Sequence, residues 1–223
     1  MSIVGLALGL LVVGGIEGLA AGDISSDAVL AFSTPAQIVG NVLVLFMIAK
    51  VLQISVHRTL GFEVRPMDGL FIFVGAAISL LLGYILSPLA EIVGADDDPQ
   101  ALTELLSEVS LGIPITVAFF SVVVFVPMVE ELLFRGILQR AVGNHLNRVS
   151  TILVTGIVFG VIHLVGLTNP SFGNVIVVIV PLSLIGILLS WVADRDGRIG
   201  RTIALHTGIN ALVFIVILLD LSI

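Results

Sequence analysis

Six polar side chains interrupt the apolar stretches of this sequence, in three groups along the chain. Glutamate and histidine can abstract, donate or relay protons, and an amide beside them can donate hydrogen bonds to an anion. Ionisable side chains are costly inside hydrocarbon, so those that a membrane segment keeps are candidates for function. The three groups are Glu130, Glu131 and Arg135; His163; and His206 with Asn210.

Helix geometry predicts different surroundings for the two adjacent glutamates. Glu131 and Arg135 are four residues apart and share a helix face, in the acid-before-base order that favours pairing. Glu130 points roughly 100° away from Glu131. We therefore expect Arg135 to bind Glu131, while Glu130 faces groups on other helices. The same spacing places Phe159 and His163 on one face of a later helix.

The elements that must position these side chains are membrane-spanning helices. Only 11% of the 223 residues are charged and 58% are hydrophobic, whereas a soluble domain carries about 25% charged residues. The absence of cysteine excludes disulfides and thiolate chemistry. We predict an all-α polytopic membrane protein, a bundle of about seven transmembrane helices that forms a single integral membrane domain over residues 1–223. Apolar runs long enough to cross a bilayer lie near 3–22, 36–54, 68–88, 112–134, 151–168, 174–193 and 202–221.

The charges between these runs predict an orientation. Seven spans place all nine lysine and arginine residues on one side, if Arg135 is counted at the end of its helix. By the positive-inside rule that side is the cytoplasm. The N-terminus is then predicted to be cytoplasmic and the C-terminus outside, in the cell (plasma) membrane. On the outer side, Asp98 and Pro99 favour the start of a short amphipathic surface helix.

The polar groups of the fourth, fifth and seventh runs are predicted to meet in the cytoplasmic half of the membrane. His206 and Asn210 share a helix face, because they too are four residues apart. Each residue has a structural alternative, since a histidine can make one interhelical hydrogen bond and an arginine can anchor a helix end. A transporter or proton relay is a non-enzymatic alternative, although it would need polar residues through the full membrane depth. A membrane scaffold or immunity factor without turnover is another.

The three groups resemble the motifs of the CPBP intramembrane proteases, also called the Abi or CAAX prenyl endopeptidase family. That family's pattern is Glu-Glu-x-x-x-Arg, then Phe-x-x-x-His, then His-x-x-x-Asn or Asp. The same residues occur here in the same order, at Glu130–Arg135, Phe159–His163 and His206–Asn210. The resemblance covers about residues 112–221, which it marks as the protease core.

The resemblance implies an endopeptidase that acts on a membrane-associated protein or peptide, which in some members is a prenylated CAAX tail. It implies Glu130 as the general base, with His163 helping to hold and polarise the attacking water. It implies His206 and Asn210 as hydrogen-bond donors to the oxyanion. The supporting residues are Glu131, Arg135 and Phe159.

No metal cofactor is favoured, because the zinc-binding pattern His-Glu-x-x-His is absent. A zinc-dependent version of the same protease stays open, with Glu130, His163 and His206 as its ligands. The partners that we expect are the lipid bilayer and a membrane-associated protein or peptide substrate. The basic residues are few and scattered, which gives no reason to expect nucleic acid.

Overall fold

The computed structural model describes residues 60–95, 112–167 and 170–219, together with isolated positions between 39 and 50. Those residues form helices and no strand, so the predicted all-α fold is confirmed. The described residues include five helices long and apolar enough to cross a membrane, which makes the chain a multi-pass membrane protein. These spans are Pro66–Val93, Ile113–Gly143, Arg148–Val165, Phe172–Asp196 and Gly200–Leu218.

The five spans correspond to the third to seventh apolar runs of the sequence. The predicted spans 3–22 and 36–54 lie wholly or largely outside the described residues, as does the predicted surface helix after Asp98. The count of seven spans therefore stays a prediction. In chain order the elements are η2 (Pro66–Gly69), α5 (Leu70–Val93), α7 (Ile113–Phe119), η3 (Phe120–Phe125), α8 (Val126–Glu131), η4 (Leu132–Leu138), α9 (Gln139–Gly143), α10 (Arg148–Ile162), η5 (His163–Gly166), α11 (Phe172–Asp196) and α12 (Gly200–Leu218).

The span Ile113–Gly143 is one long helix that alternates between α-helical and π-helical geometry. Two π-helical stretches, η3 and η4, lie on either side of the short α8, and the two glutamates end α8. The sequence pattern predicted that this helix ends near residue 134 with Arg135 at its end, and that prediction was wrong. The helix continues because the polar side chains beyond residue 134 bind another helix instead of lipid. Arg135 and Gln139 each donate a hydrogen bond to a backbone carbonyl of α11.

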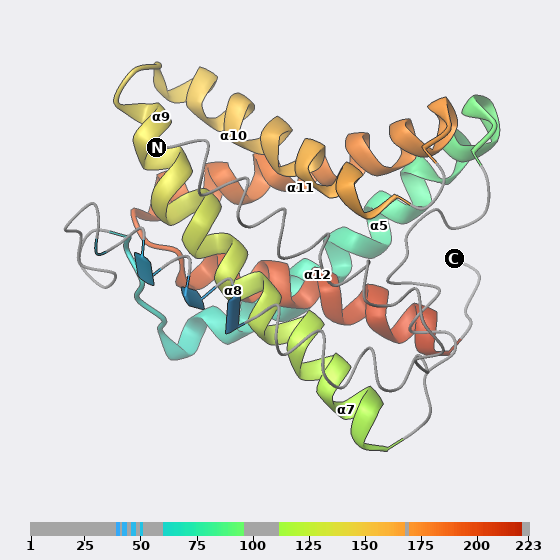
Figure 1. Cartoon of the computed structure of the whole chain (residues 1–223), viewed down its shortest axis with the longest axis horizontal. Helices are drawn as coiled ribbons and strands as arrows, with labels where there is room; N and C mark the ends of the chain where they lie inside the picture. Colours follow the sequence, from blue (N-terminus) through green and yellow to red (C-terminus); the bar gives the residue numbers. More distant parts are fainter. Residues whose placement is uncertain are drawn as a thin grey trace.

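Small residues allow the other helices to cross closely (Figure 1). Along the interface of α10 with α11, Gly156 lies against Ile187, and Gly160 lies against Ser183. Where α12 crosses α5, Gly208 lies against the α5 backbone. A Cβ atom at any of these glycines would overlap with the neighbouring helix, so glycine permits the close approach.

The described basic residues other than Arg135 gather at one end of the bundle. Arg140 at the end of the long helix donates to the carbonyl of Gly197, in the turn between α11 and α12. Arg198 in the same turn binds Asp68 through two hydrogen bonds of 2.5 and 2.8 Å. Those hydrogen bonds raise the pKa of the Arg198 guanidinium, which therefore stays charged. This end is the one that the positive-inside rule predicts to be cytoplasmic.

Candidate active site

Glu130 lies between two histidines that come from other helices. His163 is the first residue of η5, directly after α10, and its Nε2 lies 3.9 Å from Glu130 Oε1. His206 lies in α12, and its Nε2 is 3.6 Å from Glu130 Oε2. The side chains of Glu130 and His163 are 23% and 26% exposed, whereas the side chain of His206 is 5% exposed. Three of the predicted site residues thus meet here, with the accessible carboxylate of Glu130 facing both histidines.

Both histidines turn the same ring nitrogen toward Glu130. The Nδ1 of His163 is 2.7 Å from the carbonyl oxygen of Phe159. The Nδ1 of His206 is 3.0 Å from Glu131 Oε1. A carbonyl or an ionised carboxylate only accepts hydrogen bonds, so we assign a proton to each Nδ1. Each Nε2 is then left to face Glu130.

Glu131 and Arg135 form an ion pair that is sealed inside the protein. Arg135 Nη1 donates to Glu131 Oε1 over 2.8 Å, and both side chains are completely buried. Arg135 Nη2 donates to the carbonyl of Gly186 in α11, over 3.0 Å. Because Glu131 Oε1 also accepts from His206, this carboxylate links the ion pair to a site histidine. Glu131 is therefore the buried member of the glutamate pair, whereas the side chain of Glu130 is 23% exposed.

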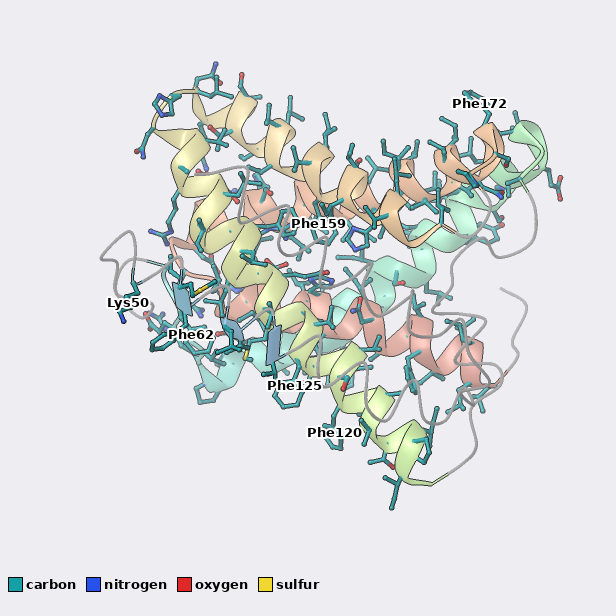
Figure 2. The ribbon with its side chains drawn as sticks, viewed as in Figure 1. Lys50, Phe62, Phe120, Phe125, Phe159 and Phe172 are labelled. Carbon is teal, nitrogen blue, oxygen red and sulfur yellow. The ribbon has the colours of Figure 1, made fainter. Side chains whose placement is uncertain are left out.

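The Phe159 ring packs against both the buried arginine and the two site histidines. It is fully buried, and Figure 2 shows it in the interior of the bundle. Its centroid lies 4.8 Å from the Arg135 guanidinium, which allows a cation–π contact. The rings of His163 and His206 lie 4.7 and 5.6 Å from it. Phe159 thus fixes His163 twice, through ring packing and through the carbonyl that accepts from Nδ1.

Asn210 is held by a different contact. Its Nδ2 donates to the backbone carbonyl of Val122 in η3 over 2.9 Å. Among the described residues, no hydrogen bond or ion pair joins Asn210 to Glu130 or to either histidine. Asn210 therefore contacts the part of the long helix that directly precedes α8.

The residues that meet here lie within one stretch of the chain, from the start of α7 to the second half of α12. Residues 112–212 match the Rce1-like family model, described as type II CAAX prenyl endopeptidase. The predicted resemblance is confirmed over this region, and it supports a CAAX-type intramembrane protease at the level of the family. No curated protein and no solved structure matches the chain.

Besides the bond from Asn210 to Val122, two features of this region were not predicted from the sequence. One is the hydrogen bond between His206 and Glu131, which joins residues far apart in the chain. The other is Gln139, whose Nε2 donates to the carbonyl of Ser190 one turn beyond the Gly186 carbonyl. The spacing gives one indication of this contact, because a glutamine four residues after an arginine shares its helix face. Arg135 and Gln139 together fasten the long helix to α11 at two successive turns.

A catalytic zinc centre would require the candidate ligands of this site to lie close together. Zinc in a catalytic site takes three protein ligands at about 2.0–2.2 Å when these are nitrogen or oxygen. In the described part of the chain, no three histidine, aspartate or glutamate side chains are arranged to hold a metal ion. No step below is routed through a metal.

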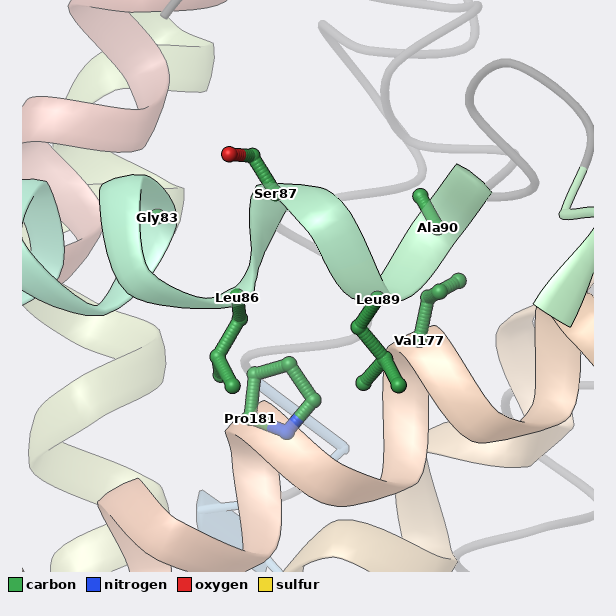
Figure 3. A pocket seen from close by; sticks show the side chains of 7 residues that line it. All are labelled: Gly83, Leu86, Ser87, Leu89, Ala90, Val177 and Pro181. Atoms are coloured by element: carbon green, nitrogen blue, oxygen red, sulfur yellow. The ribbon is translucent and has the colours of Figure 1, made fainter. Parts of the chain in front are cut away.

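A pocket lies away from these residues. It measures about 330 Å³ and lies between α5 and α11 (Figure 3). Each of these two helices contains a proline. Pro88 in α5 and Pro181 in α11 both interrupt helical hydrogen bonding, and Pro181 lines the pocket. None of the predicted site residues lines it.

Proposed function

We propose that this protein is an intramembrane endopeptidase that hydrolyses a peptide bond in a membrane-associated protein or peptide, with Glu130 as the general base. The observation that carries the proposal is the position of Glu130. Its partly exposed carboxylate lies 3.6–3.9 Å from the Nε2 atoms of two histidines on two other helices. Those distances exceed a direct hydrogen bond and leave a place for a polar group, such as water, between them.

The reaction follows from the polar groups around that place. Glu130 takes a proton from the water, whose oxygen then attacks the carbonyl carbon of the scissile bond. His163 holds the water, because its ring is fixed by the Phe159 carbonyl. When the tetrahedral intermediate collapses, Glu130 returns the proton to the leaving amine. No covalent enzyme intermediate is formed.

The role proposed for His206 is to stabilise the oxyanion. Its Nδ1 already donates to Glu131, so it can donate from Nε2 only when that nitrogen carries a proton as well. Asn210 has two amide hydrogens, of which one is directed to Val122, and the second is the one that an oxyanion could use.

The proposed substrate is a peptide that presents its scissile bond to the membrane, a CAAX-like prenylated tail being the form that the family match favours. The proposed location is the plasma membrane, with the basic end of the bundle in the cytoplasm. The site would then open toward the cytoplasmic half of the bilayer.

The test is cleavage of an internally quenched peptide by the full-length protein in liposomes. The peptide ends in a farnesylated CAAX sequence, and a non-prenylated copy is assayed in parallel. Glu130→Gln keeps the shape of the side chain but removes the base, so we expect a loss of about 100- to 10,000-fold in kcat. Glu91→Gln is the matched control, because Glu91 is exposed near the far end of α5 and should leave cleavage unchanged. Retention of cleavage within tenfold in Glu130→Gln contradicts the proposal.

The metal-dependent version of the same protease is separated by a chelator. With Glu130 acting as the base without metal, cleavage persists in 1,10-phenanthroline and in EDTA. Loss of cleavage in the chelator, with recovery on adding Zn²⁺, would establish the metal-dependent version instead.

A further inference from the structure

Asn210 binds a backbone carbonyl that the long helix cannot satisfy itself. In the π-helical stretch η3, the N–H of Val126 bonds the carbonyl of Ser121, five residues back. The next bond in that pattern would join residue 127 to the carbonyl of Val122. Residue 127 is Pro127, which has no N–H. Asn210 Nδ2 donates to the Val122 carbonyl instead, over 2.9 Å.

We infer that Asn210 is a positioning residue, which replaces the hydrogen bond that Pro127 cannot make and thereby fixes the backbone that leads to Glu130. Pro127 and Val129 are buried, and Glu130 follows within a single turn of α8. A carbonyl left without a donor in the membrane interior is costly, and the π-helical geometry of η3 would change to relieve it. Such a change alters where Glu130 stands between the histidines.

The packing of α12 supports this inference. Three residues of α12, each four positions apart, contact successive parts of the long helix. His206 bonds Glu131, and Asn210 bonds Val122. Phe214 lies edge-on to Phe119 at 5.5 Å and belongs to the apolar cluster at that end. One face of α12 therefore holds the long helix both before and at the glutamates.

This inference deepens the proposed function and differs from the role that the family resemblance implies for Asn210. A donor to the oxyanion acts on the reacting atoms, so its loss cannot be repaired by a change in the helix backbone. A positioning residue acts through the Val122 carbonyl, so its loss can be repaired by restoring a donor at residue 127. Pro127→Ala restores that N–H without adding side-chain volume.

The experiment is a double-mutant cycle with Pro127→Ala, Asn210→Ala and the combined variant, assayed with the farnesylated peptide in liposomes. We expect Asn210→Ala to lower kcat about 10- to 100-fold with little change in KM, because a buried carbonyl loses its donor and Glu130 is displaced. Measured against Pro127→Ala, the combined variant should lose less than about threefold. An equal loss from Asn210→Ala in both backgrounds overturns the inference and assigns Asn210 to the oxyanion.

The same cycle is also read by thermal unfolding in detergent. Pro127→Ala should recover most of the stability, or of the folded yield, that Asn210→Ala loses, and no recovery counts against the inference. This reading does not depend on catalysis. If Glu130→Gln keeps full activity, the proposed function fails, while the unfolding cycle still tests the hydrogen bond at Val122.

Discussion

The completely buried ion pair between Glu131 and Arg135 makes a sharp prediction about stability. Arg135→Leu removes the cation that pairs with the buried carboxylate of Glu131, which keeps its contact with His206. It also removes the hydrogen bond to the Gly186 carbonyl and the contact with the Phe159 ring. Breaking a buried pair by removing one partner costs about 3–5 kcal/mol. For a chain of this size that corresponds to a fall of roughly 6–20 °C in the unfolding temperature.

A second variant separates the buried charge from the lost packing. Glu131→Gln combined with Arg135→Leu removes both charges but keeps an oxygen that can accept from His206 Nδ1. Replacing a buried ion pair by neutral groups is often close to neutral. We therefore expect the combined variant to be more stable than Arg135→Leu alone, by on the order of 2 kcal/mol.

The assay is thermal unfolding of the purified protein in detergent micelles, followed by tryptophan fluorescence. Arg195→Leu is the matched control. Arg195 is exposed on α11, and its guanidinium lies over the face of the Trp191 ring. Its replacement should cost less than about 1 kcal/mol. The reasoning is refuted if Arg135→Leu unfolds within 2 °C of the parent protein, or if the combined variant is less stable than the single one.

Three further outcomes follow from the packing and the site. Gly75→Ala should destabilise by about 1–3 kcal/mol, because its Cβ would overlap with the α12 backbone. Gly83→Ala on the same helix has nothing within 4 Å and should be neutral or stabilising in the same unfolding assay. Asp68→Asn leaves the charged Arg198 half-satisfied, and we expect a lower unfolding temperature that an added Arg198→Gln partly restores. His163→Ala should lower kcat for the quenched peptide at least tenfold, with unchanged unfolding, because its side chain is partly exposed.

The pairing of Glu131 with Arg135 could be predicted from the sequence because it depends only on local geometry. Residues four apart on a helix share a face whatever surrounds them. The same rule separated Glu130 from Glu131. The apolar runs predicted five helices that the structure contains, because the length and hydrophobicity needed to cross a bilayer are properties of a segment.

The remaining contacts could not be predicted because they depend on how helices cross. The bond from His206 to Glu131 and the bond from Asn210 to Val122 each join segments at least 75 residues apart. The end of the long helix was predicted too early for a related reason. From the sequence alone, an arginine in a hydrophobic run is interpreted as lying at the membrane–water interface. The carboxylate and the carbonyl that bind it inside the protein become known only from the structure. The contact of Gln139 was not predicted, because the sequence does not show which group an uncharged polar residue binds. Here that group is a backbone carbonyl of α11.

The two π-helical stretches account for the contacts that the glutamate-bearing segment makes with other helices. A π-helical turn is rare and is retained mostly where function requires it. Here η3 and η4 enclose α8, so the short helix that carries both glutamates is not held by regular α-helical turns on either side. Its position is fixed from outside instead. Asn210 binds the backbone before it, and Arg135 and Gln139 bind α11 after it. Each of these bonds therefore acts on the position of Glu130, and each is a place where kcat can change although the altered residue does not touch the substrate.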